Sequence, residues 1–190
     1  MTTPNLGYDA QEIANLKEEC QQAGQPYVIN ENEPQGEEFA HIYFVGKHEG
    51  REVIFDTVIY TLRLHHSSLL YEMAEDKAAE KFPNYVRWEP EEDENGELVV
   101  PEDVDEEIEL FKAETIAELE DAEAVKVQEH VELDTDFEYG ISLDVCLHVE
   151  EITDEVIEKF VNDFNSGTLQ LDETMYSFTN DEDYDDEDEQ

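Results

Sequence analysis

The chain has 190 residues, of which 54 are Asp or Glu and only 10 are Lys or Arg, so its formal net charge is −44 at pH 7. A surface this negative repels nucleic-acid backbones and anionic membrane surfaces, because proteins bind both through Lys and Arg. The composition therefore disfavours direct nucleic-acid or membrane binding and favours a basic protein surface or a divalent cation as partner.

The first half of the chain predicts a helix, a β-hairpin and a second helix. Apolar residues at helical spacing and a following Gly predict a helix over 10–24. The β-rich runs 38–45 and 52–64 flank a turn region from Gly46 to Gly50 and predict the hairpin. The pattern then becomes helical from 65 to 81, and Pro83 ends it.

Residues 91–102, "EEDENGELVVPE", follow this helix and resemble the EF-hand calcium loop. Such a loop has oxygen ligands at positions 1, 3, 5 and 12, Gly at position 6 and a backbone carbonyl ligand at position 7. The matching residues here are Glu91, Asp93, Asn95, Glu102, Gly96 and Glu97. The resemblance implies a calcium site, and it covers these twelve residues only.

The same residues have a second interpretation as an acidic turn. Position 1 is Glu rather than Asp, and Pro83 and Pro90 interrupt the helix that an EF-hand needs before its loop. Asn95-Gly96 is also a strong signal for a tight hairpin turn. Both interpretations, a calcium loop and a turn, stay open at this point.

The second half of the chain predicts helix, hairpin and helix again. Val104, Ile108, Phe111 and Leu119 share one face of a long helix over 102–123, and acids cover the rest of it. Alternating apolar residues from Val125 to Leu133 and over 141–149 predict the second hairpin. A last helix over 153–165 has Thr153 as its predicted N-cap and stops near Gly167.

We therefore predict an α+β fold with an antiparallel sheet built from two β-hairpins and amphipathic helices packed on one face. The element order is compatible with an αββα pseudo-repeat, although no residue-level repeat accompanies it. Residues 1–179 are predicted to form a single domain. Residues 180–190 are predicted to be a disordered acidic tail, because 181–190 hold eight carboxylates and no base.

The second predicted hairpin also carries a candidate metal or thiol site. Strand alternation sends Cys146 and His148 to one face, and His130 to the same face of the partner strand. Such a group could ligate zinc or pair a thiolate with an imidazole. The same alternation is expected of any hairpin with one solvated face, and nearby acids would raise the pKa of the Cys146 thiol.

The chain shows no signal-peptide pattern and no run of eighteen apolar residues, so we expect a cytoplasmic protein. Its two cysteines form no CxxC pair, and no catalytic signature such as GxSxG or GxxxxGK[ST] occurs. We therefore expect no cofactor and favour a non-enzymatic, acidic protein-interaction domain, with nucleic-acid mimicry as one variant. The alternative is a divalent-metal-binding protein or small metalloenzyme that uses calcium or zinc. High-salt adaptation of a whole proteome is a further explanation of the acidity, and the sequence does not fix the oligomeric state.

Overall fold

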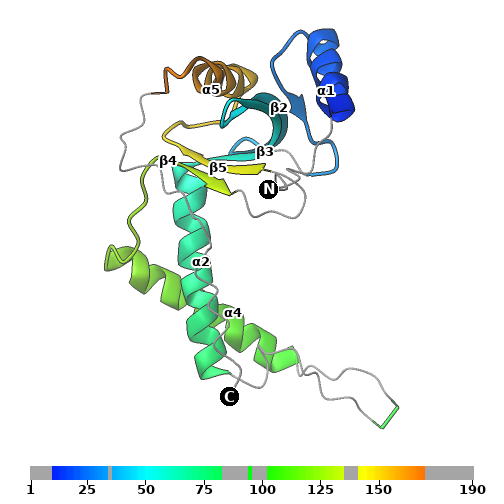
Figure 1. The fold of residues 1–190 in the computed structure, drawn as a ribbon. Helices are drawn as coiled ribbons and strands as arrows, with labels where there is room; N and C mark the ends of the chain where they lie inside the picture. The colour runs from blue at the N-terminus through cyan, green and yellow to red at the C-terminus, as the bar shows by residue number, and fades with distance from the viewer. Residues whose placement is uncertain (1–9, 34–35, 83–93, 96–101, 135–140, 170–190) are drawn as a thin grey trace, which may run out of the picture. The chain divides into compact units, whose positions relative to one another are not determined.

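The structure is a computed structural model that describes residues 10–33, 36–82, 94–95, 102–134 and 141–169, the side chains of 102 and 103 excepted (Figure 1). The chain divides into two compact units. The first contains the residues up to Arg63 together with those from Gln128 onward, and the second contains Leu64–Val127. The second unit is thus inserted into the sequence of the first.

A five-stranded mixed sheet forms the centre of the first unit, and its strand order is β1-β2-β3-β5-β4. Neighbouring strands are antiparallel except β3 and β5, which are parallel. The strands are β1 (Val28–Ile29), β2 (Phe39–His48), β3 (Arg51–Thr61), β4 (His130–Asp134) and β5 (Ile141–Leu147).

The predicted antiparallel sheet is therefore wrong at the junction between β3 and β5. The chain leaves the sheet after β3, passes through the inserted unit and returns in β4, at the opposite edge from β1. It then places β5 between β4 and β3. Parallel neighbours need a long connection, and the insertion of residues 64–127 supplies one.

A two-residue turn at Glu49 and Gly50 joins β2 to β3. Both residues have positive φ, 50° at Glu49 and 78° at Gly50. This is the backbone of a type I′ turn, whose twist matches that of the strands on either side. Gly50 suits the second position because a residue without Cβ adopts positive φ without steric cost.

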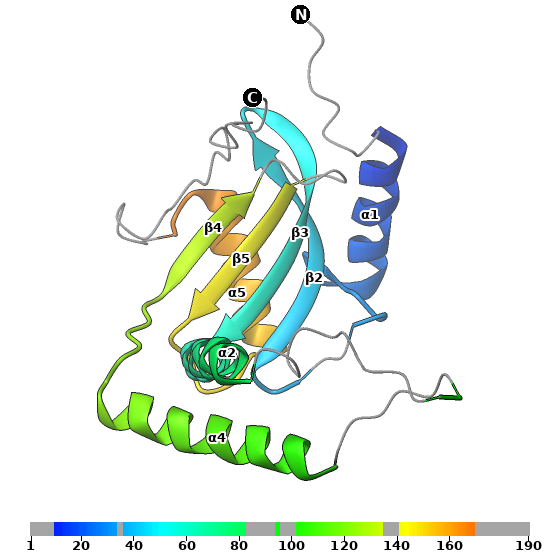
Figure 2. The ribbon, with the colours of Figure 1, turned by 90° about the horizontal axis from the view of Figure 1, so that it is seen from below.

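The core of the first unit lies between the sheet and helix α5 (Asp154–Ser166). Figures 1 and 2 show α5 across one face of the sheet, and helix α1 (Ala10–Ala23) lies on the same side. The fully buried Phe44 is central to this core. Its ring stacks on Phe55 at 5.1 Å between centroids and makes edge contacts with Phe160 and Phe164 at 6.4 and 5.4 Å.

Helix α5 has the ends that its sequence predicts. The Thr153 hydroxyl oxygen accepts a hydrogen bond from the Val156 backbone N–H at 3.3 Å, as an N-cap does. At the other end Gly167 has φ 70°, and its N–H donates to the Phe164 carbonyl oxygen at 3.3 Å. Gly is favoured there because the left-handed conformation strains residues with a Cβ.

The second unit contains helix α4 (Glu102–Asp121) and all but the first two residues of helix α2 (Leu62–Lys81). Phe82, just after α2, contacts Phe111 of α4 edge to face, at 5.8 Å between ring centroids. The Lys81 ammonium lies 4.3 Å from the centre of the Phe111 ring. Ile108 and Leu119 are buried as the helical pattern predicts.

The α+β class and the approximate positions of the four helices are confirmed. No described helix is long and apolar enough to cross a membrane. The acidic tail at 180–190 lies outside the described residues. The single domain over 1–179 and the pseudo-repeat stay predictions.

Candidate functional site

The face of the sheet opposite the α5 core carries ionisable side chains from β2, β3, β4 and β5. The observed register pairs His130 with Cys146 and Glu132 with Asp144 across β4 and β5. On the other side of β5, Tyr60 of β3 pairs with Cys146. The expected placement of His130 and Cys146 on the same face of neighbouring strands is thus correct. This polar sheet face is the first candidate site.

Tyr60, His130 and Asp144 form one hydrogen-bonded group on the polar sheet face. The Tyr60 hydroxyl donates to Asp144 Oδ1, and its oxygen lies 3.1 Å from His130 Nε2. His130 Nδ1 lies 3.1 Å from the Gln128 carbonyl oxygen, which can only accept, so Nδ1 carries a hydrogen. Burial and the bond to Asp144 raise the pKa of Tyr60. The group links β3, β4 and β5 by side chains as well as by the backbone.

Replacing Tyr60 by Phe is expected to lower the free energy of unfolding by about 1–2 kcal/mol, because it removes the hydroxyl but keeps the ring. Urea unfolding followed by circular dichroism measures this change. The matched control is Tyr71→Phe, because the Tyr71 side chain is 44% exposed and its hydroxyl accepts only a long bond, 3.4 Å, from Lys112. Equal effects of the two substitutions would contradict a special role for the Tyr60 hydroxyl.

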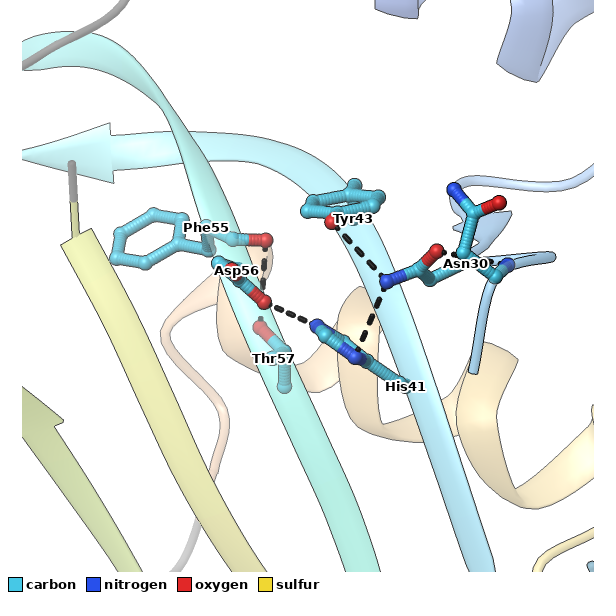
Figure 3. Close-up of polar contacts among 7 residues, drawn as sticks. Asn30, His41, Tyr43, Phe55, Asp56 and Thr57 are labelled. Carbon is cyan, nitrogen blue, oxygen red and sulfur yellow. Dashed lines mark hydrogen bonds and ion pairs between the residues drawn. The ribbon is translucent and has the colours of Figure 1, made fainter. Parts of the chain in front are cut away.

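A second polar group on the same face is centred on His41 (Figure 3). The Asn30 side-chain nitrogen donates to His41 Nδ1 and to the Tyr43 hydroxyl oxygen, each at 3.2 Å. The Asn30 side-chain oxygen accepts from the Asn32 backbone N–H at 3.1 Å. His41 Nδ1 is therefore an acceptor, and Nε2–H donates to Asp56 Oδ1. These bonds fix both the ring orientation and the tautomer.

The His41–Asp56 pair resembles part of a catalytic triad in composition but not in arrangement. In a triad the second ring nitrogen faces a nucleophile, whereas here it accepts a hydrogen bond from the Asn30 amide. We therefore interpret the group as structural. Sequence reasoning missed it, although Asp56 gave a signal: a carboxylate within the apolar run from Val53 to Tyr60 needs a partner if it is partly buried.

The predicted zinc or thiol site is only partly assembled. Cys146 is fully buried. Its burial is the main cause that raises the pKa of its thiol to about 11, and the negative charges of Asp144 and Glu129 raise it further. A thiol with this pKa is a weak nucleophile and metal ligand at neutral pH. His148 is exposed beyond the end of β5, and its backbone N–H donates to Glu129 Oε1 at 2.7 Å. Among the described residues no three His, Cys, Asp or Glu side chains form a group able to hold a metal ion. The zinc site at His130, Cys146 and His148 stays a prediction.

The predicted calcium loop falls largely outside the described residues. This applies to Glu91, Asp93 and Glu97, whereas Asn95 lies in a turn and Glu102 is the first residue of α4. The turn at Asn95 fits either interpretation of the loop. The calcium site therefore stays a prediction.

Among the described residues of the first unit, a cleft and a groove are large enough to consider as ligand sites. A cleft of about 400 Å³ lies between α1 and the end of α5, where Lys17 is paired with Glu52 at 2.5 Å and burial raises the pKa of the Cys20 thiol. The remaining lining residues are Pro26, Val45, Gly46, Lys47 and Asn165. A mostly apolar groove of about 210 Å³ beside Phe164 is smaller than the roughly 300 Å³ at which small-molecule sites begin. The Cys20 thiol of the cleft is therefore not activated, and the Lys17 charge is paired, so these two residues do not indicate a reaction there.

Helix α4 carries the densest exposed charge on a described element. Its exposed carboxylates, which we call the acidic face of α4, are Asp105, Glu106, Glu107, Glu109, Glu114, Glu118, Glu120 and Asp121. Lys112, the single base in this helix, has a side chain only 12% exposed. Its ammonium lies 3.6 Å from Glu75 of α2 and 5.2 Å from the centre of the Tyr71 ring. It also lies 3.2 Å from Glu109, a member of the acidic face. Lys112 therefore pairs with one carboxylate of the acidic face and one of α2, and α4 has no second base for the other seven.

Leu110 lies within the acidic face and is 61% exposed. It is the most exposed large apolar side chain among the described residues. At about 100° per residue it lies about 160° around the helix from the buried row of Ile108, Thr115 and Leu119. Sequence reasoning passed over it because it falls outside the apolar row that predicts the core.

Comparisons with protein families, with curated proteins and with solved structures find no match to this chain.

Proposed function

We propose that this protein is a non-enzymatic interaction protein that binds a basic protein surface through the acidic face of α4. The observation that supports this most directly is the set of eight exposed carboxylates on one helix that has a single Lys, which pairs with only one of them, Glu109, and with Glu75 of α2. Charges that are complementary across an interface accelerate encounter and select the partner more than they add affinity. We therefore expect fast, salt-sensitive binding.

The spacing of the carboxylates on α4 favours one kind of basic partner, a protein that binds nucleic acid. From Asp105 to Asp121 the helix rises by about 24 Å at about 1.5 Å per residue. Eight carboxylates over that length correspond to about one negative charge per 3.4 Å, the axial spacing of phosphates along one DNA strand. On this proposal α4 occupies the basic groove of a protein that otherwise binds nucleic acid.

The test compares two triple variants that change the net charge equally. Glu106, Glu107 and Glu114 of α4 are replaced by Gln in one variant, and the exposed Glu12, Glu18 and Glu19 of α1 are replaced by Gln in the other. Binding of a lysine-rich peptide of about 20 residues is measured by calorimetry at low and moderately high salt.

We expect the α4 variant to bind the peptide about tenfold more weakly than the wild type, because three lost charge pairs at roughly 0.5 kcal/mol each amount to about one decade of affinity. The α1 variant should change affinity by less than about threefold, and added salt should weaken binding in all three proteins. Equal losses in the two variants would show attraction to overall charge and would overturn the proposal of a site on α4.

A further inference from the structure

The acidic face of α4 is not uniformly polar, and its apolar centre points to the kind of partner. Leu110 is bracketed along the helix by Glu106 and Glu107, one turn before it, and by Glu114, one turn after it. All three carboxylates are exposed. An exposed large apolar side chain inside a charged rim has the anatomy of a protein-binding hot spot, in which polar groups around the anchor exclude water.

The residues beside Leu110 favour a helix as the partner's element. Ala113 and Ala117 are exposed and lie within about 60° of Leu110 around the axis. Helices pack with their axes about 8–10 Å apart, and small side chains at the contact allow the closer end of that range. Leu110 then projects beyond its Ala neighbours into the partner.

From these features we infer that α4 binds a basic amphipathic helix, with Leu110 buried against an apolar residue of that helix. This inference rests on the proposed function and specifies its partner. Glu106 and Glu114 lie four residues before and after Leu110, about 6 Å along the axis on each side. The partner therefore carries Lys or Arg about one turn before and after its own apolar residue.

Charge complementarity selects this partner over the other surfaces that could cover Leu110. A second copy of the chain would bring another acidic face of α4 against the first, and a membrane with anionic lipids would repel it. The footprint of one helix face, roughly 30 Å by 10 Å, is also well below the roughly 800 Å² per partner of stable complexes. The complex is accordingly transient, and its affinity depends strongly on the single apolar anchor.

The experiment combines two peptides with two single variants. Both peptides are 18-residue helices of equal positive charge; one has a row of Leu on one face, and the other has Ala at the same positions. The variants are Leu110→Ala and Tyr71→Ala, which truncate the two large apolar side chains that are exposed among the described residues. Dissociation constants are measured by fluorescence anisotropy, and sedimentation velocity gives the oligomeric state.

We expect Leu110→Ala to weaken binding of the Leu peptide about tenfold and to change binding of the Ala peptide by less than twofold, because only the first pair loses an apolar contact. Tyr71→Ala removes a contact of Lys112, so any change in affinity should be the same for both peptides, because they carry equal charge. Ala favours helix, so the Leu110 variant keeps its fold, and circular dichroism checks this.

The role of Leu110 as an apolar anchor would be overturned if Leu110→Ala weakened binding of both peptides equally. It would also be overturned if Leu110→Ala and Tyr71→Ala weakened binding of the Leu peptide equally. Neither result would contradict electrostatic binding by α4. A wild-type dimer that Leu110→Ala converts to monomer would also overturn it, because the face would then be a contact between copies. Loss of the proposed function itself has a different signature: the Glu→Gln variants of α4 and α1 would then behave alike.

Discussion

Replacing Phe44 by Ala is expected to lower the free energy of unfolding by about 3–5 kcal/mol. The side chain is fully buried and touches Phe55 of β3 and both Phe160 and Phe164 of α5, so its removal leaves a cavity where sheet and helix meet. Typical domains have about 5–15 kcal/mol of stability, and this loss is a large part of it. Urea unfolding followed by circular dichroism measures the change.

The matched control is Phe39→Ala on the same strand. Phe39 is only half-buried and alternates to the polar sheet face, so the same truncation should cost less than about 2 kcal/mol. Similar losses from both substitutions would contradict the assignment of the core to the α5 side of the sheet.

Raising the pH from 8 to 10.5 is expected to destabilise the fold, and Cys146 should account for about 2 kcal/mol of the loss. Burial raises the pKa of Cys146 from 9.0 to about 11 in the folded protein, so the folded state favours the neutral thiol. A group whose pKa is raised on folding contributes its full stabilisation below the unfolded pKa, and this contribution is lost as the pH rises through the folded pKa. The loss from Cys146 therefore falls between about pH 9 and pH 11, at about 1.4 kcal/mol per pH unit.

The measurement is the free energy of unfolding in urea at intervals across this pH range. Cys146→Ala should flatten the dependence above pH 9, whereas Cys20→Ala should leave most of it in place, because Cys20 is only partly buried. Burial also raises the pKa values of Tyr27 and Tyr60, which steepens the loss above about pH 10 in every variant. A Cys146→Ala curve parallel to that of the wild type would contradict a neutral, buried thiol.

The proposed binding surface and the polar sheet face have different physical characters. On the sheet face, His41 and Tyr60 have specific partners that hold strands together. On α4 eight carboxylates are exposed, and the single base, Lys112, pairs with only one of them, Glu109. Ordered polar groups with satisfied bonds stabilise a fold, whereas exposed charge of one sign opposes compaction and is available to a partner. This contrast is why we place binding on α4 rather than on the sheet.

Local signals in the sequence were sufficient for the helices and for the caps of α5. Thr153 and Gly167 cap the two ends of α5, and each contacts only residues within about one turn of its own end. In α4 the buried Ile108 and Leu119 recur at helical spacing. The placement of His130 and Cys146 on the same face of their strands was equally predictable, because strand periodicity depends only on neighbouring residues. Their direct pairing required the register of β4 against β5. The negative charge of α4 can likewise be predicted from the sequence.

Contacts between residues far apart in the sequence decided the features of the fold that local patterns did not predict. The parallel contact of β3 with β5 joins segments separated by the inserted residues 64–127, and no local pattern distinguishes it from an antiparallel neighbour. The contact of His41 with Asp56 required the register of β2 against β3, and the exposure of Leu110 required knowing which side of α4 faces α2. The sequence by itself thus determined the helices, the faces of β4 and β5 and the acidity of α4. Only the tertiary structure decided the order of the strands and which polar groups have partners, because both depend on contacts between residues far apart in the chain.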